Sequence, residues 1–134
     1  MTTFATPATV PSAVSAAEAG VAAVHRYYQL VDAGDVAGLV ALFTPSASYH
    51  RPGYAPMVGH AAMTAFYSGA RVIREGAHTV TTAVAAGDQV AVHGRFAGTL
   101  HTGEEVALRF ADFFHLAPDT RFTRRDTFFF APLV

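Results

Sequence analysis

The chain has 134 residues, of which 51% are hydrophobic and 14% charged, and this length and apolar content are typical of one compact domain and not of a disordered chain. Its formal net charge of -1 offers no basic field to the phosphates of nucleic acids or to anionic lipids, so neither is an expected partner. The absence of cysteine excludes disulfides, thiolate nucleophiles and thiolate metal sites.

The amino-terminal stretch MTTFATPATVPSAVS is mainly Thr, Ala, Pro and Ser and has no hydrophobic periodicity. We therefore expect residues 1–15 to form a flexible tail and residues 16–134 to form a single domain. The stretch lacks the cationic start and continuous apolar core of a signal peptide, and no apolar run reaches the ~18 to 20 residues of a membrane span. A cytoplasmic location is expected.

Helical periodicity dominates the first half of the domain. Apolar residues recur at spacings of three and four from Ala16 until Ala-Gly-Asp at 33–35 breaks the run, which predicts one amphipathic helix. Asp35 is a suitable cap for a short second helix that Pro45 ends, and a third helix is expected over residues 61–67. The loop at 52–59 carries two prolines and two glycines.

Strand patterns account for the rest of the chain and are joined by Gly-Asp and Thr-Gly turns. The expected strands are residues 46–51, 78–85, 89–100, 106–116 and 122–130. Helices followed by an antiparallel sheet indicate the α+β class.

The turns predict which side chains share a sheet face. A two-residue turn at Thr102 and Gly103 sets His93 opposite Asp112, with Arg95 on the same face, and a turn centred on Ala86 and Gly87 adds His78. A slip of one residue in either hairpin would reverse half of this set. Two interpretations stay open: a solvated or structural network of charges, or a pocket in which a carboxylate orients an imidazole for proton transfer.

The segment RYYQLVDAGDVAGLVALFTPSASYHRPG, the strand FADFF and the order of elements resemble the ketosteroid isomerase and SnoaL-like branch of the nuclear-transport-factor-2-like superfamily. The resemblance covers residues 16–130. It implies a cone, in which a curved, antiparallel (mixed) sheet wraps around the long amino-terminal helix, with two further short helices and a pocket at the wide end.

Three residues match positions that act in the isomerases. The resemblance implies that Tyr27 donates to a developing oxyanion, that Tyr67 supports it, and that Asp112 is a protonated second donor. The isomerase base, an aspartate before a proline, is replaced by Arg51, which cannot remove a proton from carbon at neutral pH. Steroid isomerisation by the usual mechanism is therefore not expected.

Two other branches of the superfamily suggest roles for the same face. SnoaL-like cyclases use a His and an Asp for ring closure without a metal or cofactor, and His93 and Asp112 are the analogous pair here. Limonene epoxide hydrolases use an Asp-Arg-Asp arrangement around a water, which Asp112 and Arg95 imitate. The second aspartate is missing, because Asp126 and its neighbour Arg125 are expected on the outer face. Of the adjacent tyrosines, about 100° apart on a helix, only Tyr27 is expected to face the pocket.

We therefore expect an acid–base enzyme, with no cofactor and no metal, that acts on a hydrophobic oxygenated small molecule. A SnoaL-like cyclase of secondary metabolism, or a related isomerase or dehydratase, is favoured. The alternatives are an epoxide hydrolase-like enzyme and a non-catalytic module for ligand binding or dimerisation. A homodimer is expected because Val90, Val92, Phe96, Ala107 and Phe113 are assigned to an apolar outer face. The expected catalytic residues are Asp112, His93 and Tyr27, and the expected substrate contacts are Arg51, Tyr54, Tyr67, His78, Arg95, Phe110 and Phe114.

Overall fold

The computed structural model describes residues 13–130. The helices are α1 (Ala13–Ala33), α2 (Val36–Ala41) and α3 (His60–Ala65), the last continued by a π-helical turn, η1 (Phe66–Ala70). The strands are β1 (Phe43–His50), β2 (Met57–Val58), β3 (Ile73–Ala86), β4 (Gln89–Leu100), β5 (Glu105–Leu116) and β6 (Phe122–Phe129).

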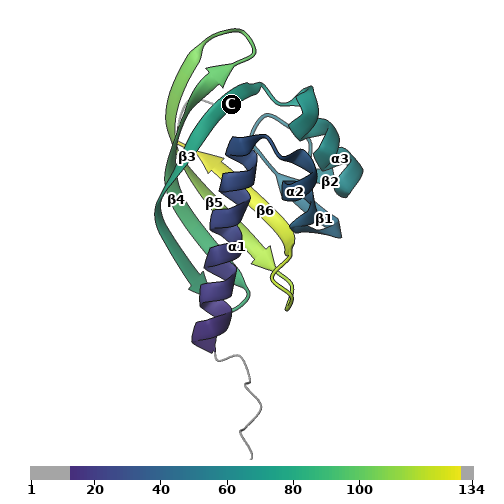
Figure 1. The fold of residues 1–134 in the computed structure, drawn as a ribbon, viewed down its shortest axis with the longest axis vertical. Coiled ribbons are helices and arrows are strands. Elements are labelled where there is room, and N and C mark those ends of the chain that lie inside the picture. Colours follow the sequence, from purple (N-terminus) through teal and green to yellow (C-terminus); the bar gives the residue numbers. More distant parts are fainter. Residues whose placement is uncertain (1–12, 131–134) are drawn as a thin grey trace, which may run out of the picture.

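One curved sheet of order β2-β1-β6-β5-β4-β3 forms the body of the molecule. Every neighbouring pair is antiparallel except β1 and β6, which are parallel, so the sheet is mixed. The long helix α1 lies along the concave side of this sheet, and α2 and α3 lie beside β1 and β2 (Figure 1). The predicted α+β cone is confirmed. No helix within residues 13–130 is long and apolar enough to cross a bilayer.

Two glycines allow Phe96 to lie flat against the concave side of the sheet. A Cβ atom at Gly76 would lie 2.3 Å from Cζ of Phe96, and one at Gly98 would lie 2.4 Å from the carbonyl oxygen of Glu75. Neither distance is possible for a real side chain, so only glycine lets β3 and β4 approach the ring this closely.

Several element boundaries differ from the predicted ones; strand β3, for example, begins at Ile73 and not at residue 78. Helix α1 begins at Ala13 and not at Ala16, and residues 1–12 of the expected tail lie outside the described part of the chain. Strand β1 includes Pro45, which lies at a shift in the pairing between β1 and β6. The prolines and glycines at 52–59 concealed the short strand β2.

The hairpin between β4 and β5 corrects the predicted register. Thr99 pairs with Glu105, and the Leu100 amide donates to the carbonyl of Glu104 at 2.8 Å, so the loop consists of three residues, His101–Gly103. Gly103 has a φ of +88°, as the last position of such a loop requires. The extra loop residue shifts the register by one, so Asp112 lies opposite Val92, and the predicted pairing of Asp112 with His93 is wrong.

The shift reverses the faces assigned to β4. His93 and Arg95 are exposed on the outer, convex face, away from Asp112. Three residues that we assigned to the outer face are buried on the inner one: Val90, Val92 and Phe96. Ala107 and Phe113 do lie on the outer face.

His78 is on the inner face as predicted, but for a different reason. The turn between β3 and β4 lies at Gly87 and Asp88, and a pairing irregularity follows between Val80 and Thr82. These two displacements together set His78 opposite Phe96 and not opposite Arg95.

Candidate active site

A buried ion pair between β5 and β6 lies at the centre of the concave face. The side chains of Asp112 and Arg125 are 0% and 4% exposed, and Nη2 of Arg125 donates to Oδ2 of Asp112 at 2.8 Å. The hydroxyls of Tyr28 and Thr127 also donate to this carboxylate. Asp112 therefore accepts hydrogen bonds from three residues of two elements, one in α1 and two in β6.

The inward position of Arg125 corrects the expectation that it lies outside with Asp126. His115 pairs with Arg124, whereas the next residue of β5, Leu116, pairs with Phe122, so Thr123 is an extra residue in β6. Such a bulge changes which residues face inward, and alternation counted from the buried Phe122 would have put Arg124 inside. In the structure Arg125 is buried and Arg124 forms an exposed ion pair with Asp126.

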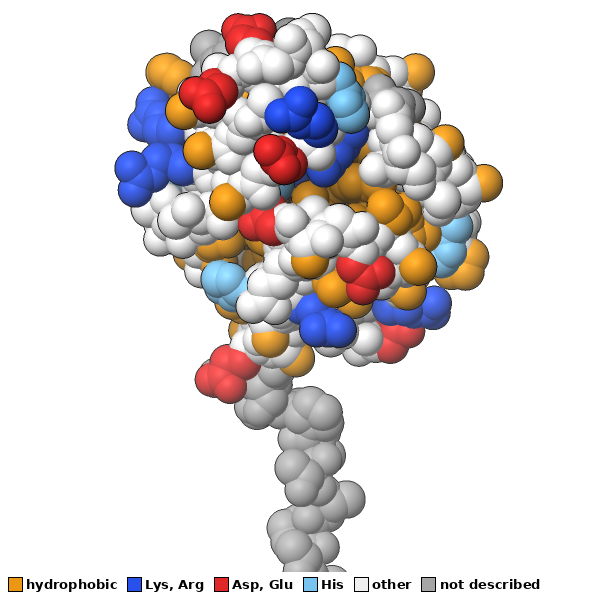
Figure 2. Space-filling view, turned by 45° about the horizontal axis from the view of Figure 1, so that its top comes forward, with side chains coloured by type: hydrophobic (Ala, Val, Ile, Leu, Met, Phe, Trp, Pro, Cys, Tyr) orange, Lys and Arg blue, Asp and Glu red, His pale blue; other side chains and the backbone are white. Residues whose placement is uncertain are grey.

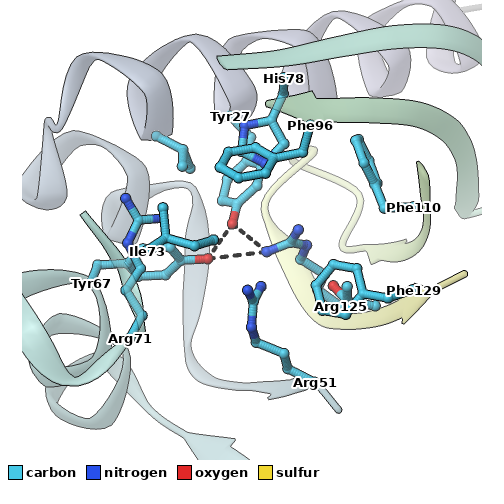
Figure 3. A pocket seen from close by; sticks show the side chains of 12 residues that line it. Tyr27, Arg51, Tyr67, Arg71, Ile73, His78, Phe96, Phe110, Arg125 and Phe129 are labelled. Carbon is cyan, nitrogen blue, oxygen red and sulfur yellow. Dashed lines mark hydrogen bonds between the residues drawn. The ribbon is translucent and has the colours of Figure 1, made fainter. Parts of the chain in front are cut away.

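Two tyrosine hydroxyls meet on the other side of Arg125. Its Nη1 donates to the hydroxyl of Tyr67 at 3.1 Å and also to the hydroxyl of Tyr27, and the two hydroxyls hydrogen-bond to each other (Figure 3). Tyr27 comes from α1, Tyr67 from η1 and Arg125 from β6, so the cluster forms only when these three elements have packed together.

Both adjacent tyrosines of α1 reach the ion pair, which corrects the expectation that one of them only packs. Their rings lie 5.3 Å apart at 71°, and the hydroxyl of Tyr27 contacts Arg125 whereas that of Tyr28 contacts Asp112. The two ends of the ion pair belong to different strands beneath the helix. Two long side chains that diverge by about 100° can therefore each reach one end.

Burial sets the protonation of this cluster. Loss of solvation raises the pKa of Tyr27 and of Tyr28 well above the ordinary value, and it raises the pKa of Tyr67 to about 12. Burial alone would lower the pKa of Arg125, but the nearby Asp112 and the tyrosines outweigh it and raise that pKa well above normal. At neutral pH the site thus presents phenol donors supported by a guanidinium cation.

One donor of the cluster has no acceptor. Nε of Arg125 is the one buried side-chain nitrogen or oxygen in the described part of the chain without a hydrogen-bond partner. Buried donors are almost always paired, so this nitrogen is an exception, and it belongs to a residue that lines the cavity described next.

The cavity beside this cluster is small, and its lining includes five Phe and Tyr rings and three arginines. Its free volume is about 20 Å³, close to what one water molecule needs. Figure 2 shows a hollow at this end of the molecule, with hydrophobic side chains in its depth and charged side chains around its rim. The lining residues are Tyr27, Val31, Arg51, Tyr67, Arg71, Ile73, His78, Phe96, Phe110, Arg125, Thr127 and Phe129.

Most of the predicted substrate contacts line this cavity, but three do not. Phe114 is fully buried behind it and packs against Tyr27. Tyr54 packs on Phe66, and its hydroxyl accepts from the Val72 amide at 3.1 Å. Arg95 lies on the outer face with His93, the predicted catalytic histidine.

Arg51 faces inward, as the resemblance indicated. It is 9% exposed, its Nη1 donates to the hydroxyl of Tyr49 at 2.8 Å, and its guanidinium lies 4.9 Å from the centre of the Phe129 ring. In Figure 3 its guanidinium points toward the cluster of Tyr67 and Arg125. The Arg51 side chain therefore forms part of the cavity wall.

Sequence reasoning missed Arg125, Tyr28, Thr127 and, as described below, Asp32. The Arg125 and Thr127 positions depend on the bulge in β6, which no turn residue signals. No group of three or more His, Asp or Glu side chains within residues 13–130 lies close enough together to hold a metal ion.

Comparisons with known proteins agree on the fold. The sequence profile of the SnoaL-like domain matches residues 24–125. No curated protein matches the chain. Among solved structures, the epoxide hydrolase/cyclase-like enzyme SalBIII, described in pyran ring formation in the polyether salinomycin, has a TM-score of 0.75 and 23% identity over 84% of this chain and 91% of its own.

Two further structures are similar. An epoxide hydrolase of M. tuberculosis, described as LEH-like, has a TM-score of 0.73 and 15% identity over 84% of both chains. TerC, co-crystallised with polyporic acid, has a TM-score of 0.73 and 21% identity over 82% of this chain and 90% of its own. At these identities the likeness concerns the fold.

Proposed function

Because the chain belongs to the SnoaL-like domain family, we propose that it is an enzyme that performs acid–base chemistry on a hydrophobic, oxygenated small molecule without a cofactor. Ring closure, as in SnoaL-like cyclases, is the favoured reaction. The observation that carries the proposal is the meeting of the Tyr27 and Tyr67 hydroxyls with the Arg125 guanidinium at an aromatic cavity.

These three groups suit the stabilisation of negative charge on a substrate oxygen. Because one of the two phenols donates to the other, one phenol proton is left for a ligand, and a carbonyl oxygen beside them would accept it from a hydroxyl whose raised pKa keeps it protonated. As charge develops on that oxygen, the cation of Arg125 stabilises it through the phenols, in a site from which burial excludes water. Donors fixed in place before the reaction need no reorganisation during it.

Asp112 has a different part in this proposal from the one that the resemblance implied. Its contacts with Tyr28, Arg125 and Thr127 all bring hydrogens to the carboxylate. We assign it to holding Arg125 in position and balancing its charge. If Asp112 were protonated and donated to the substrate, its carboxyl group would have fewer positions left to accept hydrogen bonds from Tyr28, Arg125 and Thr127.

Ring formation is supported by the description of one structurally similar enzyme. SalBIII shares the fold over most of both chains and is described in pyran ring formation. An oxygen nucleophile of the same substrate, adding to a carbon that the Tyr27 and Tyr67 donors activate, would require no metal and no redox cofactor.

Epoxide opening is the second candidate, and the ion pair of Asp112 and Arg125 favours it. The phenols of Tyr27 and Tyr67 would protonate an epoxide oxygen as its bond to carbon breaks. Among the described residues, however, no Asp or Glu lines the cavity to activate a water. An intramolecular nucleophile therefore fits the site better than hydrolysis.

The test compares the wild type with Tyr27→Phe on hydroxy-epoxides and poly-β-ketones, and mass spectrometry follows cyclic and hydrated products. Loss of one oxyanion donor should lower kcat by about 100- to 1000-fold with a small change in KM. Equal kcat values for both proteins would overturn the proposed role. If no compound reacts but one raises the Tm of the wild type and not of Tyr27→Phe, the protein is a ligand-binding module.

A further inference from the structure

We infer that His78 and Asp32 form the proton-transferring half of the site, with Nε2 of His78 as general base and Asp32 as its positioning residue. This inference rests on the proposed function and adds the base that the oxyanion cluster of Tyr27, Tyr67 and Arg125 lacks, since a protonated phenol and a guanidinium cation do not remove a proton from carbon.

Asp32 near the end of α1 holds His78 of β3 in two ways. Its Oδ1 lies 2.6 Å from Nδ1 of the His78 ring, and its Oδ2 accepts from the His78 amide at 2.9 Å. The backbone contact fixes the position of His78 along β3, and the side-chain contact fixes the rotation of its ring. A general base needs a fixed position and a fixed ring rotation, because its lone pair must point at the proton that it removes.

The contact also determines which ring nitrogen is basic. A carboxylate accepts hydrogen bonds, so the proton of the neutral imidazole resides on Nδ1, and the lone pair is on Nε2. Within residues 13–130 nothing hydrogen-bonds to Nε2. That nitrogen is therefore free to take a proton.

The ring of His78 lies at the wall of the same cavity as the oxyanion cluster. It packs 4.8 Å from the ring centre of Phe96 and 5.5 Å from that of Phe110, and its side chain is 11% exposed. In Figure 3 the Tyr27 hydroxyl lies between His78 and Phe96 on one side and Tyr67 and Arg125 on the other. A substrate would have to widen this cavity, whose free volume is about 20 Å³, and would then have a base at one end and hydrogen-bond donors at the other.

The step that this arrangement permits is proton transfer next to a carbonyl group. Nε2 takes the proton from the carbon, the electron pair of the broken C–H bond forms the C=C bond of an enolate, and the carbonyl π electrons move to oxygen. One phenol of the Tyr27 and Tyr67 pair donates to that oxygen, and the other phenol donates to the first. The enolate carbon then attacks an electrophilic carbon of the same molecule, and the imidazolium returns its proton to the alkoxide that forms.

A purely structural link would not require the ring. The amide of His78 and Oδ2 of Asp32 already join β3 to α1, whereas the second contact orients an imidazole whose other nitrogen has no partner. The two interpretations differ in a measurable way, because only the catalytic one makes the reaction rate depend on Nε2.

The probe is 5-nitrobenzisoxazole, a planar aromatic compound that reports on both halves of the site. A base removes its carbon-bound proton, the electrons form a nitrile, the N–O bond breaks, and the oxygen leaves as a coloured phenolate. The variants are His78→Gln, Asp32→Asn and Tyr27→Phe. His25→Gln is the matched control, because His25 is exposed on α1, the helix that carries Asp32.

His78→Gln should lower kcat by about 100-fold or more with KM within about twofold, the loss typical of a general base. Asp32→Asn should lower kcat by about tenfold, and His25→Gln should match the wild type. Nitrogen-15 NMR should show the ring proton of His78 on Nδ1 in the wild type. In Asp32→Asn the same single proton should be divided between the Nδ1 and Nε2 tautomers.

Each alternative result has a definite meaning. An unchanged kcat in His78→Gln, or a wild-type rate no higher than that of free imidazole at equal concentration, overturns the general base. A lower Tm in Asp32→Asn with unchanged kcat and unchanged NMR signals makes Asp32 only a structural link. If kcat falls in His78→Gln but not in Tyr27→Phe, the proposed role of Tyr27 at the oxyanion is wrong, whereas the roles of His78 and Asp32 are supported.

Discussion

Two ion pairs from adjacent positions of β6 point to opposite faces of the sheet. Arg124 bonds Asp126 at 3.0 Å on the outer face, with side chains 48% and 20% exposed. Arg125 bonds Asp112 at 2.8 Å on the inner face, with side chains 4% and 0% exposed. The same chemistry in neighbouring residues therefore experiences water on one side and almost none on the other.

The difference lies in what desolvation costs. The exposed pair contributes about 0–1 kcal/mol, because water screens it and two mobile side chains must be ordered. The buried pair needs several hydrogen bonds to offset the loss of hydration, and Arg125 and Asp112 obtain them from Tyr27, Tyr28, Tyr67 and Thr127. Well-packed apolar residues often serve stability equally well, so the buried pair fits a functional role.

Removal of the Arg125 cation from the inner face should produce the largest loss of stability. Arg125→Met leaves the fully buried carboxylate of Asp112 without its cation, which should lower the free energy of unfolding by about 3–5 kcal/mol. Urea denaturation measures the loss. Arg124→Met on the outer face is the matched control and should change the value by less than about 1 kcal/mol.

The double variant Arg125→Met/Asp112→Leu checks the cause of that loss. It removes the stranded charge together with its partner, so it should recover much of the stability. If it is as unstable as the single variant, the packing of the arginine side chain, and not the charge of Asp112, dominates.

A smaller effect is expected at high pH. The folded state holds the pKa of Tyr67 at about 12, against about 10 in the unfolded chain. Its stabilising contribution is therefore complete below about pH 10 and is lost as pH rises toward about 12, roughly 3 kcal/mol in all. The raised pKa values of Tyr27 and Tyr28 act in the same direction.

Unfolding in urea at a series of pH values tests this dependence, and Tyr67→Phe should lose about 3 kcal/mol less between pH 10 and 12 than the wild type does. Tyrosinate absorbance in the folded protein gives an independent check. Ionisation of all five tyrosines near pH 10 would show that the inner face is wetter than its packing indicates.

The smallest effect on the fold, but a clear one on association, is expected at the outer face. Phe113 and Phe128 are 41% and 55% exposed, and their rings lie 5.8 Å apart. We propose that a second copy of the chain covers this aromatic pair. This agrees with the homodimer that we expected from the sequence. Phe113→Glu/Phe128→Glu should then sediment as a monomer and keep its fold.

The wild type should show a midpoint of unfolding that rises with protein concentration, and the double variant should not. Gln29→Glu, an added charge on the exposed side of α1, is the control and should leave the dimer intact. A wild type that sediments as a monomer at micromolar concentration would exclude this dimer.

The sequence predicted the elements well and their register poorly. The periodicity of α1, the turns and the order of the strands were enough to predict most of the helices and strands of the cone. Tyr27, Tyr67 and Asp112, which the resemblance placed in the site, meet at its centre. The failures at His93, Arg95 and Arg125 share one cause. A single extra residue, in the loop His101–Gly103 or at Thr123, changes the face of every residue beyond it, and no side-chain pattern marks the insertion.

The order of synthesis has a consequence for the site, because β6 follows the other five described strands in the chain yet lies between β1 and β5 in the middle of the sheet. Until it arrives, both neighbours have open edges and the carboxylate of Asp112 has no cation. A nascent chain that has made every helix thus still lacks the centre of the site. Fusion partners or truncations at the carboxyl end should therefore affect maturation of the protein more than equivalent changes at the amino end.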